Sequence, residues 1–331
     1  MALRIGINGF GRIGRNVLRA GWDQEGLEFV HLNDLTSADS LAYLLQHDSV
    51  HGGWKSVKAV DGGLEIDGRL VRVSAEREPG KLPWGEAGVD VVLECTGRFT
   101  EGPKAQPHRD AGAPKVIISA PASKVDATFV VGVNHGTYDR AAHHIVSNAS
   151  CTTNCLAPLA KVLHETVGIE RGLMTTVHSY TMDQNLLDAP HKDFRRSRAA
   201  ALNMVPTSTG AAKAIGLVLP AIAGRLNGVA IRVPTPNGSL VDLTFTAERP
   251  TTKEEINDAL RAAAAGPLKG ILEATDAPIV SSDIIGNPHS SIADLALTDV
   301  IGGTLVKVFA WYDNEWGFSN RMLDLARIMV G

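Results

Sequence analysis

The chain has 331 residues, of which 44% are hydrophobic and 21% charged, and at roughly 100 to 200 residues per domain this length favours two domains over a small disulfide-stapled scaffold. A formal net charge of −4 gives no reason to expect nucleic acid or an anionic membrane as a partner. The chain has only three cysteines, which favours a reducing compartment. Its amino terminus does not resemble a leader, and no apolar run approaches the roughly 18 residues of a membrane span. We therefore expect a cytoplasmic protein without a membrane partner.

The first third of the chain alternates short apolar, β-branched runs with a helical pattern. We expect strands at residues 4–8, 28–33, 89–95, 116–119 and 145–147, and a helix at residues 12–22. Strands that alternate with helices are typical of βαβ units and a mainly parallel sheet. Two turn signals, Gly62-Gly63 and Asp67-Gly68, predict hairpins inserted into this pattern.

The pattern changes near residue 151. A helix is expected at 151–167, followed by longer alternating strands at 173–180, 228–233, 240–247 and 305–312. Such alternation favours an antiparallel sheet with one covered face. Thr251 and Glu254 match a capping box before a helix at 254–265, and a last helix is expected at 317–329. The predicted fold is therefore an α/β domain followed by an α+β domain with a mainly antiparallel sheet.

A glycine-rich turn, GFGRIG at residues 9–14, follows the first strand and opens the first helix. In this context Gly9 makes a tight turn, Gly11 allows a pyrophosphate to approach the backbone, and Gly14 allows close helix–strand packing. Asp34 ends the second strand, where it would accept hydrogen bonds from a ribose and repel a 2′-phosphate. These features predict NAD as the cofactor, although the same fingerprint also occurs with FAD, and three glycines can simply form a turn.

Cys151 lies in the segment SCTTNC (residues 150–155), where a strand gives way to a helix. A helix N-terminus lowers the pKa of a thiol, so Cys151 is a candidate nucleophile. Cys155, one turn further on, and Cys95, at a strand end, are better explained as core residues. Zinc ligation is a weaker interpretation of Cys151 and Cys155, because no second Cys/His cluster accompanies them, and no metal is expected. A redox dithiol is also weaker, because that motif has two residues between its cysteines rather than three.

His178 ends an apolar strand in the segment VHSYT (residues 177–181), where an isolated histidine is more often structural. Together with SCTTNC, however, this segment closely resembles phosphorylating glyceraldehyde-3-phosphate dehydrogenase. The resemblance extends over essentially the whole chain, through CTGRFT (95–100), ISAP (118–121), PTSTGAAK (206–213), RVPTP (232–236) and WYDNEWG (311–317).

The resemblance implies a Rossmann NAD-binding domain at residues 1–149, with the C-terminal helix 316–331 packing back on it, and a catalytic domain at 150–315. It also implies a homotetramer that oxidises D-glyceraldehyde 3-phosphate to 1,3-bisphosphoglycerate with NAD and inorganic phosphate. By similarity, Cys151 attacks the aldehyde and His178 is the base, so that a hemithioacetal becomes a thioester that phosphate cleaves.

The remaining site residues are also carried over by similarity. Substrate phosphate would be held by Thr181 and Arg232, and the second anion by Ser150, Thr152, Arg196, Thr209 and Gly210. Arg195 and Arg198 are left as surface or subunit-contact residues, and helix capping is the plain alternative for the hydroxyls. Cofactor contacts would come from Gly9, Gly11, Arg12, Ile13, Gly14, Asp34, Arg77, Ser119 and Asn314.

One departure and two alternatives accompany this hypothesis. Met182 stands where the family commonly has asparagine, which removes an amide donor near the cofactor and puts cofactor affinity or cooperativity in question. An erythrose-4-phosphate dehydrogenase would share most of these residues but hydrolyse its thioester. A non-catalytic NAD-binding protein is the alternative from a different class, and the presence of both Cys151 and His178 argues against it.

Overall fold

The computed structural model describes residues 2–331, which form two compact units. Unit 1 contains the chain up to Phe129, His135–Ala149 and Ser319–Gly331, and unit 2 contains Val130–Asn134 and Ser150–Phe318. Within residues 2–331, no helix is long and apolar enough to cross a membrane.

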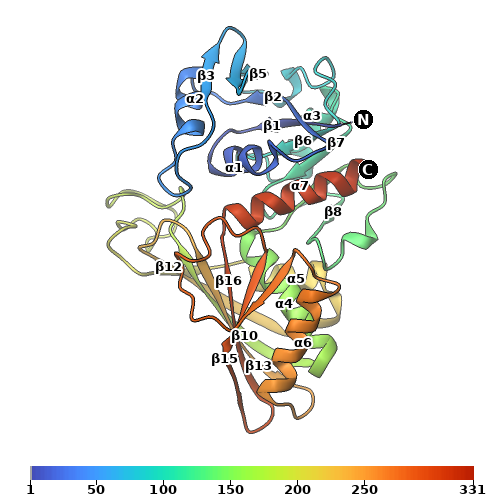
Figure 1. The fold of residues 1–331 in the computed structure, drawn as a ribbon, viewed down its shortest axis with the longest axis vertical. Helices are drawn as coiled ribbons and strands as arrows, with labels where there is room; N and C mark the ends of the chain where they lie inside the picture. The colour runs from blue at the N-terminus through green and yellow to red at the C-terminus, as the bar shows by residue number, and fades with distance from the viewer. Residues whose placement is uncertain (1) are drawn as a thin grey trace. The chain divides into compact units, whose positions relative to one another are not determined.

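Unit 1 is built on a nine-stranded sheet in the order β3-β4-β5-β2-β1-β6-β7-β9-β8 (Figure 1). Its central strands β2, β1, β6, β7 and β9 run parallel, while β3, β4 and β5 form an antiparallel meander. The meander turns at Gly62 and at Asp67-Gly68, all with positive φ, which confirms both predicted hairpins. The strands are β1 (Leu3–Asn8), β2 (Leu27–Asn33), β3 (Val57–Val60), β4 (Gly63–Ile66), β5 (Arg69–Ser74), β6 (Val91–Glu94), β7 (Lys115–Ile118), β8 (Ala127–Thr128) and β9 (Ile145–Ser147).

The helices of unit 1 are α1 (Arg12–Gly21), α2 (Ala38–Gln46), α3 (Gly102–Asp110) and most of α7 (Trp316–Val330). Gly21 lets α1 approach its neighbours closely, because a Cβ there would lie 2.8 Å from the Phe29 ring and 3.0 Å from Leu323 of α7. A core of nearly inaccessible side chains lies around β6, β7 and α3, with Trp84 as its largest member. This core fixes the strand ends that carry the cofactor-side residues.

Unit 2 contains a seven-stranded sheet in the order β11-β12-β10-β13-β16-β15-β14, contacted by α4 (Cys151–Val167), α5 (Ala211–Val218) and α6 (Lys253–Ala265) (Figure 1). Four of the six neighbouring pairs are antiparallel, and the β10–β12 and β14–β15 pairs are parallel. The expected mainly antiparallel sheet is therefore confirmed. Its strands are β10 (Ile169–Ser179), β11 (Val205–Ser208), β12 (Leu226–Val233), β13 (Ser239–Ala247), β14 (Leu272–Thr275), β15 (Ser291–Ile301) and β16 (Leu305–Tyr312).

The start of α6 corrects one expectation by a single residue. The N-cap is Thr252, whose hydroxyl accepts from the Glu255 N–H at 3.2 Å, rather than Thr251. Thr251 is instead held by the neighbouring loop, since its N–H donates to the Gly303 carbonyl at 2.8 Å. The predicted spacing of three residues between threonine and glutamate is present, but the cap is the next threonine because Thr251 is engaged by a tertiary contact.

Candidate active site

The glycine turn of unit 1 gives each glycine a separate task. Gly9 has φ +90°, and a Cβ there would lie 2.6 Å from the Thr96 nitrogen. A Cβ on Gly14 would lie 2.2 Å from the Gly9 carbonyl oxygen, so this glycine sets the packing of α1 on the turn. Gly11, the N-cap of α1, faces open space. Nothing within the chain requires Gly11 to lack a side chain, whereas close approach of a pyrophosphate to a helix N-terminus does.

Asp34 is joined to the same turn. It follows β2, and its Oδ2 accepts from the Phe10 N–H at 2.8 Å while its Oδ1 accepts from the Thr36 N–H at 3.1 Å. The strand order reverses at β1, which has β2 on one side and β6 on the other. In parallel α/β sheets, such a switch point forms the ligand crevice at the carboxyl ends of the strands.

The other predicted cofactor residues of unit 1 lie on several segments. Arg12 in α1 pairs with the nearly buried carboxylate of Asp48 at 2.5 Å. Burial raises the pKa of Asp48, but the His51 and Val50 N–H groups and Arg12 outweigh it and lower that pKa to about 2. Ser119 directly follows β7 and is half-buried, and Arg77 is exposed after β5. Ile13, in the first turn of α1, is half-buried.

A buried polar network lies under this turn, and the sequence analysis did not identify it. Glu94 Oε2 accepts from Asn8 Nδ2 at 2.6 Å and lies 3.0 Å from His108 Nε2. Trp84 Nε1 donates to His108 Nδ1 at 3.0 Å, so the Nε2–H of His108 points to Glu94. Asn33 joins the network through Asn8 and also binds Gly9, whose N–H donates to the Asn33 carbonyl at 2.8 Å. The network ties β1, β2, β6 and α3 together beneath the glycine turn.

Cys151 occupies the first position of α4 in unit 2. Ser150 is the N-cap, and its hydroxyl accepts from the Thr153 N–H at 3.0 Å. The first N–H groups of a helix have no intrahelical partner, so they can stabilise negative charge near the sulfur. Cys155 is fully buried one turn later, and its thiol contacts Ser291 and the Ala310 carbonyl, so the predicted packing role is confirmed.

His178 and Arg232 reach the sulfur from two adjacent strands. His178 and Arg232 are the next-to-last residues of β10 and β12, and the parallel register pairs the two residues directly. The Cys151 Sγ lies 3.4 Å from His178 Nε2, while the Ser179 carbonyl oxygen lies 2.8 Å from His178 Nδ1. The Ser179 carbonyl can only accept, so it favours the tautomer with the proton on Nδ1, whereas the Arg232 guanidinium can only donate and lies 2.5 Å from the same Nδ1, so it favours the proton on Nε2. A general base requires the first tautomer, in which the Nε2 lone pair faces the thiol.

The titration of this pair corrects the expectation of a lowered thiol pKa. Burial raises the pKa of the Cys151 thiol, and this outweighs the opposing effects of Arg232, Thr152 and the helix N-terminus. Burial and the Arg232 charge lower the pKa of His178 to about 3. Both shifts favour the uncharged forms of the pair, a thiol and a neutral imidazole.

Tyr312 is a further site residue that the sequence analysis did not identify. Its hydroxyl lies 2.8 Å from both Thr152 Oγ1 and Thr176 Oγ1, and its ring meets His178 edge-on with centroids 5.8 Å apart. It is almost completely buried, and burial raises its pKa well above the usual value. The Thr152 hydroxyl is thus held by Tyr312, while the capping role at this helix belongs to Ser150.

Arg196 and Thr181 are brought together by an acidic residue, Asp183. Arg196 Nη1 donates to Asp183 Oδ2 at 2.6 Å, and the Thr181 hydroxyl donates to Asp183 Oδ1. Arg196 Nε also donates to Thr207 Oγ1 at 2.9 Å. Partial desolvation of Asp183 opposes the Thr181 hydroxyl and the charges of Arg232 and Arg196, which together lower the pKa of this carboxyl group. An arriving phosphate would therefore compete with a fixed carboxylate for these donors.

The remaining predicted anion residues lie at or near helix starts or on the surface. Thr209 Oγ1 accepts from the Ala211 N–H at 3.2 Å, and Gly210 is the N-cap of α5. Of the neighbouring arginines, Arg198 forms an exposed pair with Asp188 at 2.9 Å and Arg195 is exposed. Arg196 is half-buried, unlike Arg195 and Arg198, and it stays the predicted anion ligand among the three arginines.

Asn314 is held with a defined amide orientation. The hydroxyls of Ser179 and Ser239 both donate to its Oδ1 at 2.8 Å. The carboxamide nitrogen is thereby left to donate elsewhere, as contact with a nicotinamide carboxamide requires. Across residues 2–331, no group of three or more His, Cys, Asp or Glu side chains could hold a metal ion.

These features define a class of protein: a dehydrogenase with a Rossmann dinucleotide turn in one unit and a cysteine–histidine pair in the other. Comparison with known proteins narrows this class. The family model for the glyceraldehyde 3-phosphate dehydrogenase NAD binding domain matches residues 3–102, and the model for the C-terminal domain of the same family matches residues 150–314.

Individual relatives agree with the family models. The chain is 59% identical over 331 residues to glyceraldehyde-3-phosphate dehydrogenase 2 of Streptomyces arenae, which covers 99% of both chains. It is also 59% identical over 327 residues to the corresponding enzymes of Bacillus subtilis and Geobacillus stearothermophilus, with 98% of each chain covered. The chain belongs to the glyceraldehyde 3-phosphate dehydrogenase family, which confirms the predicted fold class and NAD as cofactor.

Proposed function

We propose that this protein oxidises D-glyceraldehyde 3-phosphate to 1,3-bisphosphoglycerate, with inorganic phosphate as the second substrate. The observation that carries this proposal is the 3.4 Å contact between Cys151 Sγ and His178 Nε2 at the N-terminus of α4. A cysteine adjacent to a base can form and release an acyl intermediate, whereas a protein that only binds NAD needs neither residue.

The chain's own residues account for acylation. His178 takes the thiol proton through Nε2 while Cys151 attacks the aldehyde carbon, giving a hemithioacetal on the sulfur. The Cys151 N–H and the imidazolium then face the developing oxyanion. NAD, held by the glycine turn and Asp34, supplies the hydride acceptor. The imidazolium returns its proton to the oxyanion, which gives the hemithioacetal hydroxyl, and His178 takes that proton again as the hydride leaves, so that a thioester remains on Cys151.

Phosphate then cleaves the thioester at the second anion position. We assign the substrate phosphate to Thr181 and Arg232. We assign the attacking phosphate to Arg196, Ser150, Thr152, Thr209 and the Gly210 N–H. Arginine suits this role because its forked N–H donors match phosphate oxygens. A thioester retains enough of the oxidation energy for phosphate to form an acyl phosphate.

The assay follows NADH absorbance with glyceraldehyde 3-phosphate, with and without phosphate. We expect phosphate-dependent turnover in the parent protein, none in Cys151→Ala, and near-parent rates in Cys155→Ala, the matched control one helical turn away. Phosphate-independent turnover, with faster reaction of erythrose 4-phosphate, would instead identify the hydrolytic enzyme. NAD binding without turnover of either aldehyde would contradict the proposal.

We infer in addition that the chain forms a homotetramer. Six large apolar side chains are exposed in the segment 182–204, where Phe194 is 87% and Met182 88% exposed. The sheet of unit 2 adds Leu173 on β10 and Val229 on β12, both at least half exposed. Apolar clusters of this size on a soluble protein are typical of contact surfaces. Charge complementarity is not needed for such a contact.

Light scattering coupled to size exclusion tests this inference. The parent should elute with four times the 35.1 kDa chain mass. Phe194→Lys and Leu173→Lys should each shift the population to dimers or monomers, while Leu70→Lys, an exposed leucine of unit 1, should not. A monomeric parent would contradict the inference.

We also place the protein in the cytoplasm. Cys95, Cys151 and Cys155 are all free thiols, and the proposed chemistry needs Cys151 reduced. Fractionation of the source cells should recover the chain with cytoplasmic markers, and recovery with an oxidising compartment would contradict this assignment.

A further inference from the structure

A buried carboxylate at the carboxyl end of β6 has no part in the proposed reaction. Glu94 is the last residue of β6 and is 1% exposed. Its Oε1 accepts from the Thr96 N–H at 2.8 Å and from the Thr96 hydroxyl. Its Oε2 accepts from Asn8 Nδ2 at 2.6 Å and lies 3.0 Å from His108 Nε2. A buried charge is tolerated only when it is paired or hydrogen-bonded, and these four contacts account for a carboxylate at this depth.

The His108 donor on the Oε2 side has a fixed direction. Trp84 Nε1 can only donate, and it donates to His108 Nδ1 at 3.0 Å. Nδ1 is therefore the acceptor of the imidazole, and the proton of the ring is on Nε2. Both residues are completely buried. Glu94 thus meets an N–H of His108 that a change of tautomer cannot withdraw.

The Asn8 donor on the same side is fixed by Asn33. Asn33 Oδ1 accepts from the Glu76 N–H at 2.9 Å, and its Nδ2 donates to the Glu76 carbonyl at 2.8 Å, which sets the orientation of this amide. Asn33 Nδ2 also donates to Asn8 Oδ1 at 2.8 Å, so Asn8 Nδ2 is left to face Glu94. Two donors of fixed direction therefore meet Oε2.

The Oε1 side of Glu94 holds the loop that follows β6. The Thr96 hydroxyl donates to Glu94 while its oxygen accepts from the Arg98 N–H at 3.1 Å, so the loop turns around this carboxylate. The same loop lies against the glycine turn, because a Cβ on Gly9 would be 2.6 Å from the Thr96 nitrogen and 2.8 Å from the Cys95 carbonyl carbon. Glu94 therefore determines how residues 95–98 lie beside the turn.

Residues 95–98 form the second wall of the cofactor crevice. β6 is the neighbour of β1 at the point where the strand order reverses, and in parallel sheets the ligand lies there, between the loops that leave the two strands. The glycine turn leaves β1, and residues 95–98 leave β6. Thr96 is half-buried, and Gly97 and Arg98 are exposed, so the surface of this loop is accessible.

We propose that Glu94 is a positioning residue for NAD: its carboxylate holds residues 95–98 as the second wall of the crevice and acts on cofactor affinity through Thr96. The proposal rests on NAD as the cofactor and not on the aldehyde or phosphate chemistry proposed above. A purely structural role explains the Oε2 side, which joins β1, β6 and α3 in unit 1. Such a role does not require the two hydrogen bonds from the half-buried Thr96 to Oε1.

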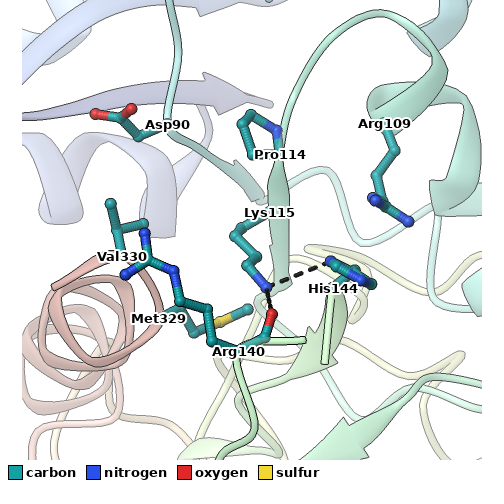
Figure 2. A pocket seen from close by; sticks show the side chains of 8 residues that line it. All are labelled: Asp90, Arg109, Pro114, Lys115, Arg140, His144, Met329 and Val330. Carbon is teal, nitrogen blue, oxygen red and sulfur yellow. Dashed lines mark hydrogen bonds between the residues drawn. The ribbon is translucent and has the colours of Figure 1, made fainter. Parts of the chain in front are cut away.

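The other end of β6 provides a matched control. Asp90 directly precedes the strand, and its Oδ2 accepts from the Arg4 N–H at 2.8 Å, so it is also a carboxylate bonded to the backbone. It lines a cavity at the amino ends of the strands, in which Lys115 donates to the Arg140 carbonyl at 2.6 Å (Figure 2). Asp90→Asn therefore removes the same charge beside the same strand without touching the crevice.

The test is an NAD titration of Glu94→Gln without aldehyde. The two fixed donors favour the new amide oxygen on the Oε2 side, so the NH2 group is turned to the Thr96 N–H, from which it cannot accept. The variant thus keeps the core contacts and releases the loop. The Kd for NAD should rise on the order of tenfold or more, as expected for lost hydrogen bonds to a charged group, and should not change in Asp90→Asn.

Steady-state kinetics and urea unfolding separate positioning from a loss of stability. Urea unfolding without NAD shows whether each variant is folded. In Glu94→Gln the KM for NAD should rise while kcat at saturating NAD stays near the parent value, as expected when an interaction common to the ground state and the transition state is lost. A folded Glu94→Gln that binds NAD like the parent, or an equal loss of affinity in Asp90→Asn, would overturn the proposal.

Thr96 gives a second test that leaves the Oε2 side intact and that decides the matter if Glu94→Gln does not fold. Thr96→Val removes the hydroxyl that donates to Glu94 and should weaken NAD binding, and Thr96→Ser should restore it. Unaltered affinity in Thr96→Val would contradict the proposal. A parent protein that binds NAD but oxidises neither aldehyde would count against the proposed function alone.

Discussion

Arg232 lies directly beside His178, with its Nη1 2.5 Å from His178 Nδ1 and 3.1 Å from the Ser179 carbonyl oxygen. The parallel pairing of β10 and β12 creates this contact, because it sets the two residues opposite each other. The guanidinium therefore acts on both partners of the reactive pair. It lowers the pKa of His178 and, by favouring the thiolate, also opposes the burial that raises the pKa of Cys151.

Replacing Arg232 by glutamine should raise both pKa values. Without the guanidinium, the thiolate loses a favourable charge and the imidazolium loses an unfavourable one. The rate of Cys151 alkylation by iodoacetamide, followed against pH, should therefore have its midpoint at higher pH in Arg232→Gln than in the parent. Arg171→Gln serves as the charge-matched control. A midpoint that stays in place or moves to lower pH would show that Arg232 does not act on the sulfur.

Gly11 and Gly14 should respond differently to the same substitution. Gly11→Ala places its methyl group in open space at an ordinary φ of −72°, so the fold should be retained while NAD binds less tightly. Gly14→Ala forces a Cβ to within 2.2 Å of the Gly9 carbonyl, so it should destabilise unit 1 by about 1–3 kcal/mol. Urea unfolding and NAD titration of both variants measure the difference. Equal loss of stability in the two would contradict the assigned roles.

Asp34→Asn should reduce the preference for NAD over NADP. The asparagine keeps an oxygen that can accept from the Phe10 N–H, but the charge that repels a 2′-phosphate is removed. The ratio of kcat/KM values for the two cofactors should fall by about tenfold or more, which corresponds to about 1.4 kcal/mol of discrimination. An unaltered ratio would exclude Asp34 as the selective residue.

The protein should lose stability in mild acid partly because of His31. Burial, and then Arg72, lower the pKa of His31 to about 4, so between about pH 6.5 and pH 4 the unfolded chain binds more protons than the folded one. Stability therefore falls as the pH decreases through this window, by up to about 3 kcal/mol from this residue. In His31→Gln, urea unfolding at pH 7 and pH 4.5 should differ less than in the parent. An equal difference would contradict the shift.

Local patterns in the sequence were sufficient for the central strands of unit 1, for α1, α4 and α6, and for part of the site. They did not predict α2, α5, β11, β14 or β15. The strand–glycine–helix order around Gly9 and Gly14, and the position of Cys151 at a helix start, depend on nearest neighbours along the chain, and the structure has them as predicted. Asp34 also follows β2 directly. The role of His178 needed the family resemblance, because its partner is 27 residues away in sequence and on another element.

Local sequence patterns could not predict the features of the site that depend on tertiary packing. The thiol pKa was predicted to fall, but desolvation of Cys151 outweighs the Arg232 charge and the N–H groups at the helix start. Tyr312 and Asp183 join the site through contacts between separate elements, and the Glu94–His108 network joins strands that no local signal pairs.

The most direct measurement is the intact mass of the protein after mixing with glyceraldehyde 3-phosphate and NAD in phosphate-free buffer. We predict a covalent acyl adduct of one triose unit per chain, mapped by peptide analysis to Cys151, released by added phosphate and absent from Cys151→Ala. Substrate consumption with unmodified protein throughout, or an adduct on Cys95 or Cys155 alone, would contradict covalent catalysis at Cys151.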